Sequence, residues 1–288
     1  MKIVLSPSKT KTIADVASNA EAVHHAVRDG QFQPNITKEI VTHVQSLDVI
    51  ALGKALKLKA DKAQALFDFY QSFEAHPVGR ACESYDGIAF KYLDWSNLSD
   101  EAKTFGESHL VVLSALYGIV EPNMGVRDYR LDMVDKVGIN LYDTWRDAVD
   151  VYFYKEDWIL NLASKEYAKM VNHPKVVTIE FWELRGDTFK QMSTSSKMSR
   201  GVMAHECLTR QVKHVRDLPR EVNGFICVSD IESITIPSES MTVRYERKWL
   251  FASARHSCKR PRRWWMADRG GIAISHVCNW WRTVAVNI

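Results

Sequence analysis

One stretch decides the fold of this 288-residue chain: Val111-Val112-Leu113-Ser114-Ala115-Leu116-Tyr117-Gly118. Its leading aliphatic residues predict a buried strand, because a short apolar run is typical of a sheet interior. Gly118 permits a sharp exit, since glycine adopts backbone angles that other residues avoid. The chain then reaches Tyr129-Arg130-Leu131-Asp132-Met133, where one arginine stands among bulky residues. An arginine in such surroundings needs an anion or a carboxylate, so the pattern predicts a strand-to-loop site near negative charge.

Further strands and helices are expected on both sides of this stretch. Short strands are predicted at Lys2–Leu5 and Trp158–Leu162, and a β-hairpin is predicted where Val176–Leu184 and Thr188–Met192 flank Arg185-Gly186-Asp187. Helices are predicted over residues 37–47 with Thr37 as N-cap, over residues 143–155 and 196–212, and from Ser99-Asp100-Glu101 onward. The alternation of strands and helices indicates a single compact mixed α/β (α+β) domain over about residues 1–248.

The sequence pattern of residues 48–73 predicts two helices joined by a tight hairpin. The first helix is expected from Asp48 to Leu56, the hairpin at Lys57–Ala60, and the second helix with Asp61 as N-cap and with Ala65, Leu66, Phe69 and Phe73 facing inward. Such an element offers backbone N–H groups to a DNA phosphate. The candidate DNA contacts are Lys54, Lys57, Lys59 and Lys62. Glycines are absent from the hairpin, and the alternative is an ordinary helical pair with a solvated lysine face.

Several short motifs follow one another along the chain. They are Leu5-Ser6-Pro7-Ser8-Lys9-Thr10, Ala60-Asp61-Lys62, Asp86-Gly87, the stretch ending at Gly118, Leu141-Tyr142 with Trp145, Asn161-Leu162-Ala163-Ser164 with Glu166-Tyr167, and Lys197 with Arg200-Gly201 and Met203. In these residues the chain resembles the YaaA (DUF328, UPF0246) family of peroxide stress proteins over roughly residues 1–248. The resemblance implies a family-specific fold with a helix–hairpin–helix-like element, DNA binding and control of intracellular iron.

The chain departs from this family at a few positions. Ala115 stands where the family has glycine, Glu121 where it tends to have a basic residue, Asp132 in place of glutamate and Val134 in place of glycine. Glu121 reverses a charge beside the predicted anion site. These differences leave the predicted fold unchanged and bear on the chemistry of the site.

A second candidate site consists of polar residues from the matching segments. They are Ser6, Lys9, Asp86, Tyr117, Arg130, Tyr142, Ser164, Lys197 and Arg200. Cations and hydroxyls are the groups that bind phosphate or a nucleotide, and Lys197 and Arg200 are spaced to share a helix face. We expect an anion-binding cleft. For any single member, the alternative is that its side chain only completes the hydrogen bonds of buried polar groups or forms a surface ion pair. Asp86-Gly87 is also typical of a simple turn.

The charge is unevenly distributed. The whole chain has a net charge of +3, but residues 249–288 hold seven Lys or Arg and one Asp, which leaves 31 basic and 34 acidic side chains in residues 1–248. DNA binding by the main body therefore requires a local basic patch. Residues 249–288 also carry five of the nine tryptophans and the cluster Lys259-Arg260-Pro261-Arg262-Arg263. This atypical tail suits either a nucleic-acid-binding appendage or a disordered or frame-shifted extension.

Other classes of protein and site are not supported. No apolar run approaches the roughly 20 residues of a membrane helix, and no signal peptide is recognised. Five scattered cysteines favour reduced thiols in the cytoplasm. Histidine and cysteine spacings predict no metal site, no Gly-rich phosphate loop indicates a cofactor, and no serine lies in a nucleophile elbow.

Two functions follow from these observations. The resemblance implies cytoplasmic protection against peroxide through DNA binding and reduced iron-driven damage. The alternative is an enzyme that holds a nucleotide or a flipped base in the same cleft for hydrolysis or transfer, with Ser6, Tyr117 and Asp86 taking part. The catalytic residues and the oligomeric state are not predicted.

Overall fold

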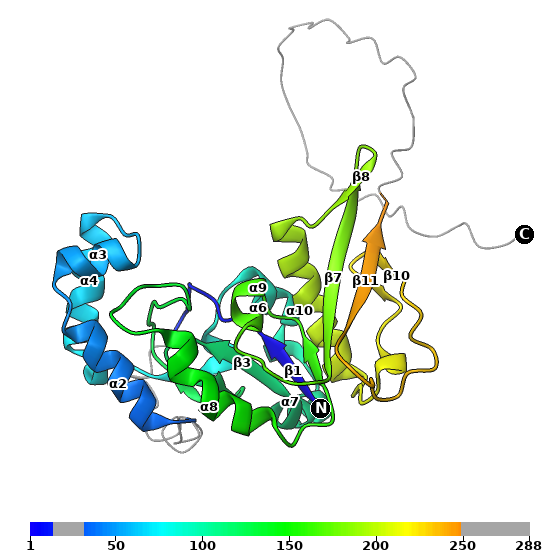
Figure 1. Cartoon of the computed structure of the whole chain (residues 1–288), viewed down its shortest axis with the longest axis horizontal. Coiled ribbons are helices and arrows are strands. Elements are labelled where there is room, and N and C mark those ends of the chain that lie inside the picture. Colours follow the sequence, from blue (N-terminus) through cyan, green and yellow to red (C-terminus); the bar gives the residue numbers. More distant parts are fainter. Residues whose placement is uncertain (14–31, 249–288) are drawn as a thin grey trace, which may run out of the picture. The chain divides into compact units, whose positions relative to one another are not determined.

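A central strand with a parallel neighbour on each side organises the fold (Figure 1). The computed structural model describes residues 1–13 and 32–248. Strand β1 (Lys2–Leu5) pairs in parallel with β3 (Leu110–Ser114) on one side and with β6 (Ile159–Asn161) on the other. The sheet runs β4-β3-β1-β6-β7-β11-β10-β9, with β8 paired to β7. Parallel and antiparallel pairs coexist, so the predicted mixed α/β class is confirmed.

The remaining strands are β2 (Gly79–Arg80), β4 (Gly118–Val120), β5 (Gly125–Val126), β7 (Val176–Arg185), β8 (Thr188–Lys190), β9 (Glu221–Val222), β10 (Phe225–Cys227) and β11 (Met241–Arg247). The α-helices of the described residues are α2 (Pro34–Gln45), α3 (Val49–Ala55), α4 (Ala60–Gln71), α5 (Ala81–Ser84), α6 (Ile88–Leu93), α7 (Asp100–His109), α8 (Leu141–Phe153), α9 (Lys165–Ala168) and α10 (Ser193–Thr209).

The strands form where the apolar pattern is clearest. All five residues of β3 are buried, as expected of a continuous apolar run between two neighbouring strands. Strand β7 instead alternates buried and half-buried positions, and its partner β11 runs parallel to it. The predicted hairpin between β7 and β8 is confirmed, and Gly186 turns it with a φ of 61°.

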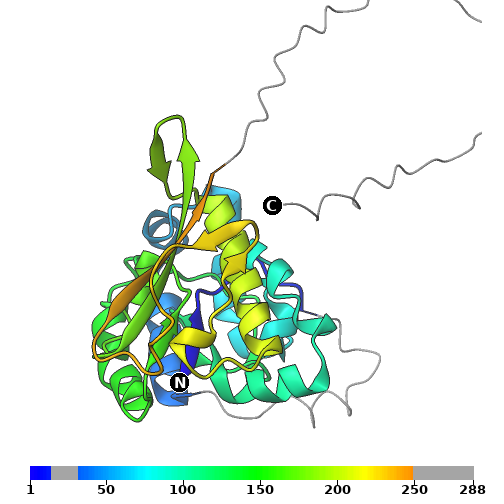
Figure 2. The same ribbon diagram turned by 90° about the vertical axis from the view of Figure 1, so that its right-hand side faces the viewer.

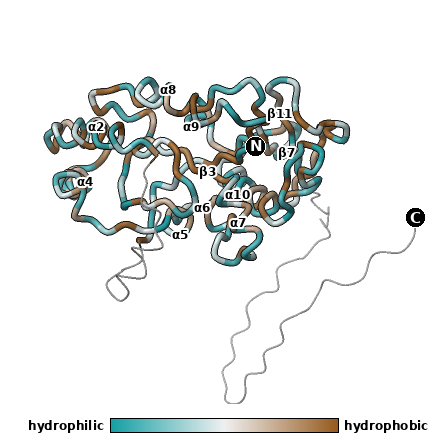
Figure 3. Tube along the Cα trace, turned by 90° about the horizontal axis from the view of Figure 1, so that it is seen from below, coloured by the Kyte–Doolittle hydropathy of each residue, from teal (hydrophilic) through white to brown (hydrophobic). Residues whose placement is uncertain are grey.

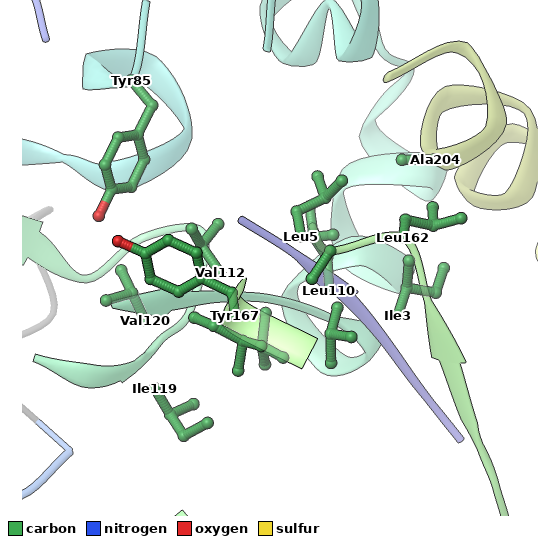
Figure 4. Close-up of a cluster of buried hydrophobic side chains, with 14 of the residues drawn as sticks. Ile3, Leu5, Tyr85, Leu110, Val112, Ile119, Val120, Leu162, Tyr167 and Ala204 are labelled. Atoms are coloured by element: carbon green, nitrogen blue, oxygen red, sulfur yellow. The ribbon is translucent and has the colours of Figure 1, made fainter. Parts of the chain in front are cut away.

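Helices cover the sheet and close the core. Ile3, Leu5 and Leu162 pack beside Ala204 of α10 (Figure 4), and α10 runs alongside β7 (Figures 1 and 2). Trp145 of α8 is buried, and its indole N–H donates to the Ala115 carbonyl at 2.9 Å. Hydrophobic residues accordingly follow β3 through the interior (Figure 3).

Three local predictions were wrong. Helix α2 begins at Pro34 with Gln33 as N-cap, and Thr37 lies inside it, because proline at the first position fixes helical backbone angles earlier. Lys59, not Asp61, is the N-cap of α4. Ala65 is exposed, since the inward stripe of α4 is formed by Ala63, Leu66 and Tyr70.

Helices α3 and α4 are joined by a short turn that needs no glycine. Asp48, where the first helix was predicted to begin, caps α3 by accepting from the Ala51 N–H at 2.7 Å. Lys57 adopts a left-handed φ of 55°, the Leu58 N–H donates to the Gly53 carbonyl at 2.8 Å, and the Lys57 N–H donates to the Lys54 carbonyl at 3.4 Å. These two bonds form a Schellman motif with lysine where glycine is usual.

Substituting Gly118 tests the exit from β3. Gly118 has a φ of 69°, and a β-carbon there would lie 2.6 Å from the Trp145 ring; Gly186 has a φ of 61° with nothing within 4 Å. Gly186→Ala should lower the free energy of unfolding by about 1–2 kcal/mol through backbone strain alone. Gly118→Ala should lower it by about 1–3 kcal/mol more, because the ring must also move. Urea denaturation of both variants measures the difference, and equal losses would contradict the packing.

Candidate functional site

The connections between strands reverse direction between β1 and β6. From β1 the chain reaches β3 and β4 on one side and then crosses to β6 on the other side. In sheets of this kind, ligands bind beyond the carboxyl ends of the strands at such a switch point. Ser6 follows β1 and Ser164 lies three residues beyond β6; the Ser164 N–H donates to Ser6 Oγ at 2.8 Å, and Ser6 Oγ donates to Ser164 Oγ at 3.2 Å. Two predicted site residues therefore meet at this point, which we call the carboxyl edge.

A cation and a carboxylate pair beside these serines. Lys9 Nζ lies 2.5 Å from Asp132 Oδ2, with the lysine side chain 63% exposed and the aspartate 15% exposed. The Tyr167 hydroxyl donates to Asp132 Oδ1 at 3.4 Å, and the Asp132 N–H donates to Asp135 Oδ2 at 2.8 Å. Asp135 thus caps the turn that carries Asp132, and the loop reaches the carboxyl edge through the Lys9 pair.

Glu166 adds a further carboxylate to this group. It stands two residues after Ser164, and its Oε1 is buried with no hydrogen-bond partner among the described residues. Partial burial raises the pKa of Glu166, and the charge of Asp132 raises it further, whereas the Val134 N–H and Lys9 oppose the rise. Burial also raises the pKa of Asp135, and the charge of Asp132 raises it further.

A buried amine lies next to the same loop. Lys11 is 8% exposed; its Nζ donates to the Tyr129 carbonyl at 2.5 Å and lies 4.0 Å from the centre of the Tyr129 ring and 5.6 Å from that of Tyr85. Burial lowers the pKa of Lys11 to about 8, against the opposing charges of Asp128 and Asp132. Aromatic faces attract the ammonium group and offset part of the cost of burial.

Buried hydroxyls form the floor of the carboxyl edge. The Tyr129 hydroxyl lies 2.7 Å from Ser114 Oγ and 3.1 Å from the Tyr85 hydroxyl. Figure 4 shows the hydroxyls of Tyr85 and Tyr167 pointing toward one another. Burial raises the pKa of Tyr85, Tyr129 and Tyr167, so these phenols stay protonated and serve as hydrogen-bond donors.

Other predicted residues lie around this centre. The Tyr142 hydroxyl donates to the Glu166 carbonyl at 3.1 Å. The Asp86 N–H donates to the Thr10 carbonyl at 3.0 Å, and the Asp86 carboxylate pairs with Lys91 at 3.2 Å. Tyr117 is fully buried, and its hydroxyl accepts from the Arg127 N–H at 3.3 Å.

Arg130, Arg200 and Lys197, the other cations of the predicted site, have fewer contacts with the carboxyl edge. Arg130 is half-buried, and its guanidinium has no ion pair or hydrogen bond among the described residues, although its carbonyl accepts from the Tyr70 hydroxyl at 3.3 Å. Lys197 is exposed on α10. Arg200 is half-buried on α10; burial lowers its pKa, and the charge of Glu180 opposes this. No contact of the described residues brings Lys197 or Arg200 to Lys9.

The four candidate DNA-binding lysines gather on the helical hairpin. Lys54, Lys57, Lys59 and Lys62 are all exposed, and none of them has an ion pair with a described residue. The Ala63 N–H makes the first intrahelical bond of α4, to the Lys59 carbonyl at 2.9 Å. The N–H groups of residues 60–62 therefore precede the helical bonding pattern and point out from the start of α4.

Sequence reasoning missed most of the carboxyl edge. Asp132, Asp135, Glu166, Tyr167 and Lys11 were not predicted as site residues. The available signals were weak: Glu166 follows Ser164 by two residues, and Asp132 follows Arg130 by two. Their convergence depends on a loop and a short helix far apart in sequence. Within residues 1–13 and 32–248, no three His, Cys, Asp or Glu side chains form a metal-binding group, and no helix is long and apolar enough to cross a membrane.

Titration of Lys11 should be visible in the stability of the protein. Its folded pKa of about 8 is below its ordinary value of 10.5, so between these pH values the unfolded chain binds more protons and stability rises with pH. Lys11→Met removes this dependence. The stability of the variant minus that of the wild type should therefore fall by about 2–4 kcal/mol from pH 8 to pH 10.5 in urea titrations. The exposed Lys165→Met serves as the control, and a constant difference for Lys11→Met would contradict the burial of a charged amine.

Comparisons with known proteins show the family of the chain. Residues 1–226 match the family model described as "Peroxide stress protein YaaA". A UPF0246 protein of Finegoldia magna is 32% identical over 228 residues, covering 76% of this chain and 89% of the relative. A UPF0246 protein of Agathobacter rectalis is 32% identical over 245 residues, covering 81% and 96%, and one of Rickettsia bellii is 29% identical over 217 residues, covering 71% and 85%. The match covers every strand from β1 to β9 and confirms the resemblance: the chain belongs to the YaaA (UPF0246) family of peroxide stress proteins.

Proposed function

We propose that this protein protects DNA in the cytoplasm during peroxide stress by binding it through the hairpin between α3 and α4. The observation that carries the proposal is the group of four exposed lysines, Lys54, Lys57, Lys59 and Lys62, without ion pairs among the described residues. Lysines of this kind can neutralise DNA phosphates and so release the counterions that are condensed on the DNA, which favours binding. Membership of the peroxide stress family supports the physiological setting.

The geometry of the hairpin supports a helix–hairpin–helix-like role. The Schellman turn at Lys57 brings the end of α3 close to the start of α4, and the ideal β-carbon of Gly53 would lie only 3.0 Å from the Ala63 β-carbon. The free N–H groups at the start of α4 and its positive dipole end favour a phosphate. Asp61 in the first turn opposes an anion there, so the surrounding lysines carry most of the attraction.

Binding by the hairpin would limit iron-driven damage indirectly. A protein that covers the backbone of DNA reduces the access of iron to phosphate and base ligands. This role needs no metal held by the protein, in keeping with the prediction of no metal site.

Three lysine substitutions test the hairpin. Lys57→Ala, Lys59→Ala and Lys62→Ala together should weaken duplex binding and reduce the slope of log affinity against log salt by about 2.7, because each phosphate contact contributes about 0.9. A salt series of fluorescence anisotropy measurements on the full chain gives both quantities. A matched triple variant of exposed lysines outside the hairpin, Lys155→Ala, Lys190→Ala and Lys213→Ala, is the control. Equal DNA affinity of the hairpin variant and the wild type would sink the hairpin proposal.

A second candidate function is a nucleotide-processing enzyme that uses the carboxyl edge. The observation that favours it is the meeting of Ser6, Lys9, Asp132 and Ser164 at the switch point, next to Glu166. Such residues can bind a phosphate and also move protons. The two functions are compatible, since the hairpin lysines and the carboxyl edge share no residue.

A further inference from the structure

We propose that the carboxyl edge cleaves the N-glycosidic bond of a nucleotide, with Glu166 as the general acid and base, Asp132 as the carboxylate that stabilises the sugar cation, and Lys9 as the phosphate-facing cation. The inference rests on the second candidate function and deepens it by naming the bond and the reacting groups. It does not depend on the hairpin lysines.

The composition of the site is that of a reaction centre. Carboxylates, an ammonium group and hydroxyls converge from three segments: Lys9 after β1, Asp132 in the loop after β5, and Glu166 and Tyr167 in α9. Lys9 is bonded to Asp132 but remains 63% exposed, so its ammonium still faces solvent. An acidic cluster alone would not bind a nucleotide, whereas this mixed group offers a cation for its phosphate.

Glu166 has an unused hydrogen-bonding position. Its Oε1 is buried and has no partner among the described residues, whereas the neighbouring Tyr142 hydroxyl donates to the backbone carbonyl of Glu166 at 3.1 Å. The Glu166 side chain is half-buried, and the N–H groups of Val134 and Met133 act on its carboxylate, so the orphan position is confined to Oε1. A buried polar oxygen without a partner is uncommon in folded proteins and leaves room for a bond to water or to a ligand. A ligand group with a donor, such as a nucleobase, would satisfy it.

The carboxylates decide between two kinds of nucleotide chemistry. Phosphoryl transfer spreads negative charge over the transferred group and requires cations, so Asp132 and Glu166 would oppose it. Glycosidic cleavage instead passes through a transition state in which the sugar becomes positive, and a pair of carboxyl groups is the common way to promote it. The charge at the carboxyl edge therefore favours breaking the bond between sugar and base.

The proposed reaction balances with water as the only co-reactant. Glu166 in its acid form gives a proton to the departing base while the bond between C1′ and the base nitrogen breaks, and the bonding electrons remain on the base. The Asp132 carboxylate stabilises the resulting sugar cation. Water then adds to C1′ and returns a proton to Glu166. The products are the free base and the sugar phosphate.

The environment of Glu166 suits its role as an acid. The charged and titratable groups that face it are Lys9, Asp132, Asp135, Tyr142 and Tyr167. Burial and the charge of Asp132 raise the pKa of Glu166, so its protonated fraction at a given pH exceeds that of an ordinary glutamate. Asp132, which pairs with Lys9, takes the other role.

Base release by the full chain tests the proposal. Free deoxynucleoside 5′-monophosphates form one arm, and single-stranded oligonucleotides containing uracil, hypoxanthine or 8-oxoguanine form the other; chromatography detects the free base. We expect release in at least one arm, and which arm responds tells whether the nucleotide is free or part of DNA. We expect the rate to fall as pH rises through the raised pKa of Glu166, because the general acid loses its proton.

Matched variants assign the residues. Glu166→Gln and Asp132→Asn should each lower kcat by about 100-fold or more, the usual contribution of a positioned acid or base. Glu166→Gln should also remove the decline of the rate at high pH, which a merely structural role would not change. Glu206→Gln, at a half-buried glutamate of α10 that pairs with Arg210 and has no contact with the carboxyl edge among the described residues, should keep the wild-type rate, and thermal melting of all variants checks the fold.

Two outcomes would overturn the proposal: no base release by the wild type in either arm between pH 5 and 8, or a Glu166→Gln variant with wild-type rate and pH profile. DNA affinity measured on the same preparations separates the two functions. If the protein binds DNA but releases no base, the reaction is rejected and the hairpin proposal stands. If it releases base and the hairpin variant binds DNA as tightly as the wild type, the hairpin proposal is rejected and the reaction stands.

Discussion

The parallel pairing of β1 on both sides is the constraint on which the rest of the structure depends. Ile3, Val4 and Leu5 are almost fully buried, so their backbone N–H and C=O groups need partners within the protein. Strands β3 and β6 supply them in register, Val4 against Val111 and Asn161. Since both neighbours run parallel to β1, the residues that follow β1 and β6 emerge at the same edge. The meeting of Ser6 and Ser164 is a consequence of that pairing.

The charge balance at this edge differs from that of a simple anion site. Lys9 is opposed by Asp132, and Glu166 and Asp135 lie close enough to Asp132 for its charge to raise their pKa values. A phosphate is attracted by Lys9 and repelled by the carboxylates here, whereas a group that becomes positive is favoured by the carboxyl groups of Asp132, Asp135 and Glu166 and opposed by Lys9. The exposed lysines of the hairpin present the opposite case, a local excess of positive charge on a body with more acidic than basic side chains. The charges of the two regions therefore differ in the way that the two proposals require, with carboxylates at the proposed sugar site and lysines at the proposed phosphate site.

The strands and helices could be predicted from local sequence patterns. The site depends instead on residues far apart in the sequence that come together only when the chain folds. Strands β1 and β3 and the hairpin at Gly186 were predictable, because burial and turn chemistry act within a few residues. The start of α2 was misplaced because Pro34 outweighed the capping preference of Thr37. Ser6, Lys9 and Ser164 were predicted as site residues because each lies in a segment that resembles the family, and Lys9 also because it follows a strand and a proline turn. Asp132 and Glu166 were missed: each reads alone as an ordinary surface acid, and only the folded chain places them together.

One loop connects the hairpin to the carboxyl edge. Arg127 Nη2 pairs with Glu74 Oε2 at 2.7 Å, and its Nε donates to the His76 carbonyl at 3.2 Å, which ties the segment after α4 to the loop. Five residues further along the same loop, Asp132 meets Lys9. The far end of α4 is thus fixed to the segment that carries a proposed reacting carboxylate, while the near end carries the lysines. A DNA strand bound at the start of α4, as proposed, would contact a helix whose other end is fixed to the loop of the proposed reaction site. The Arg127 contacts therefore link the two parts of the chain that carry the two proposed functions.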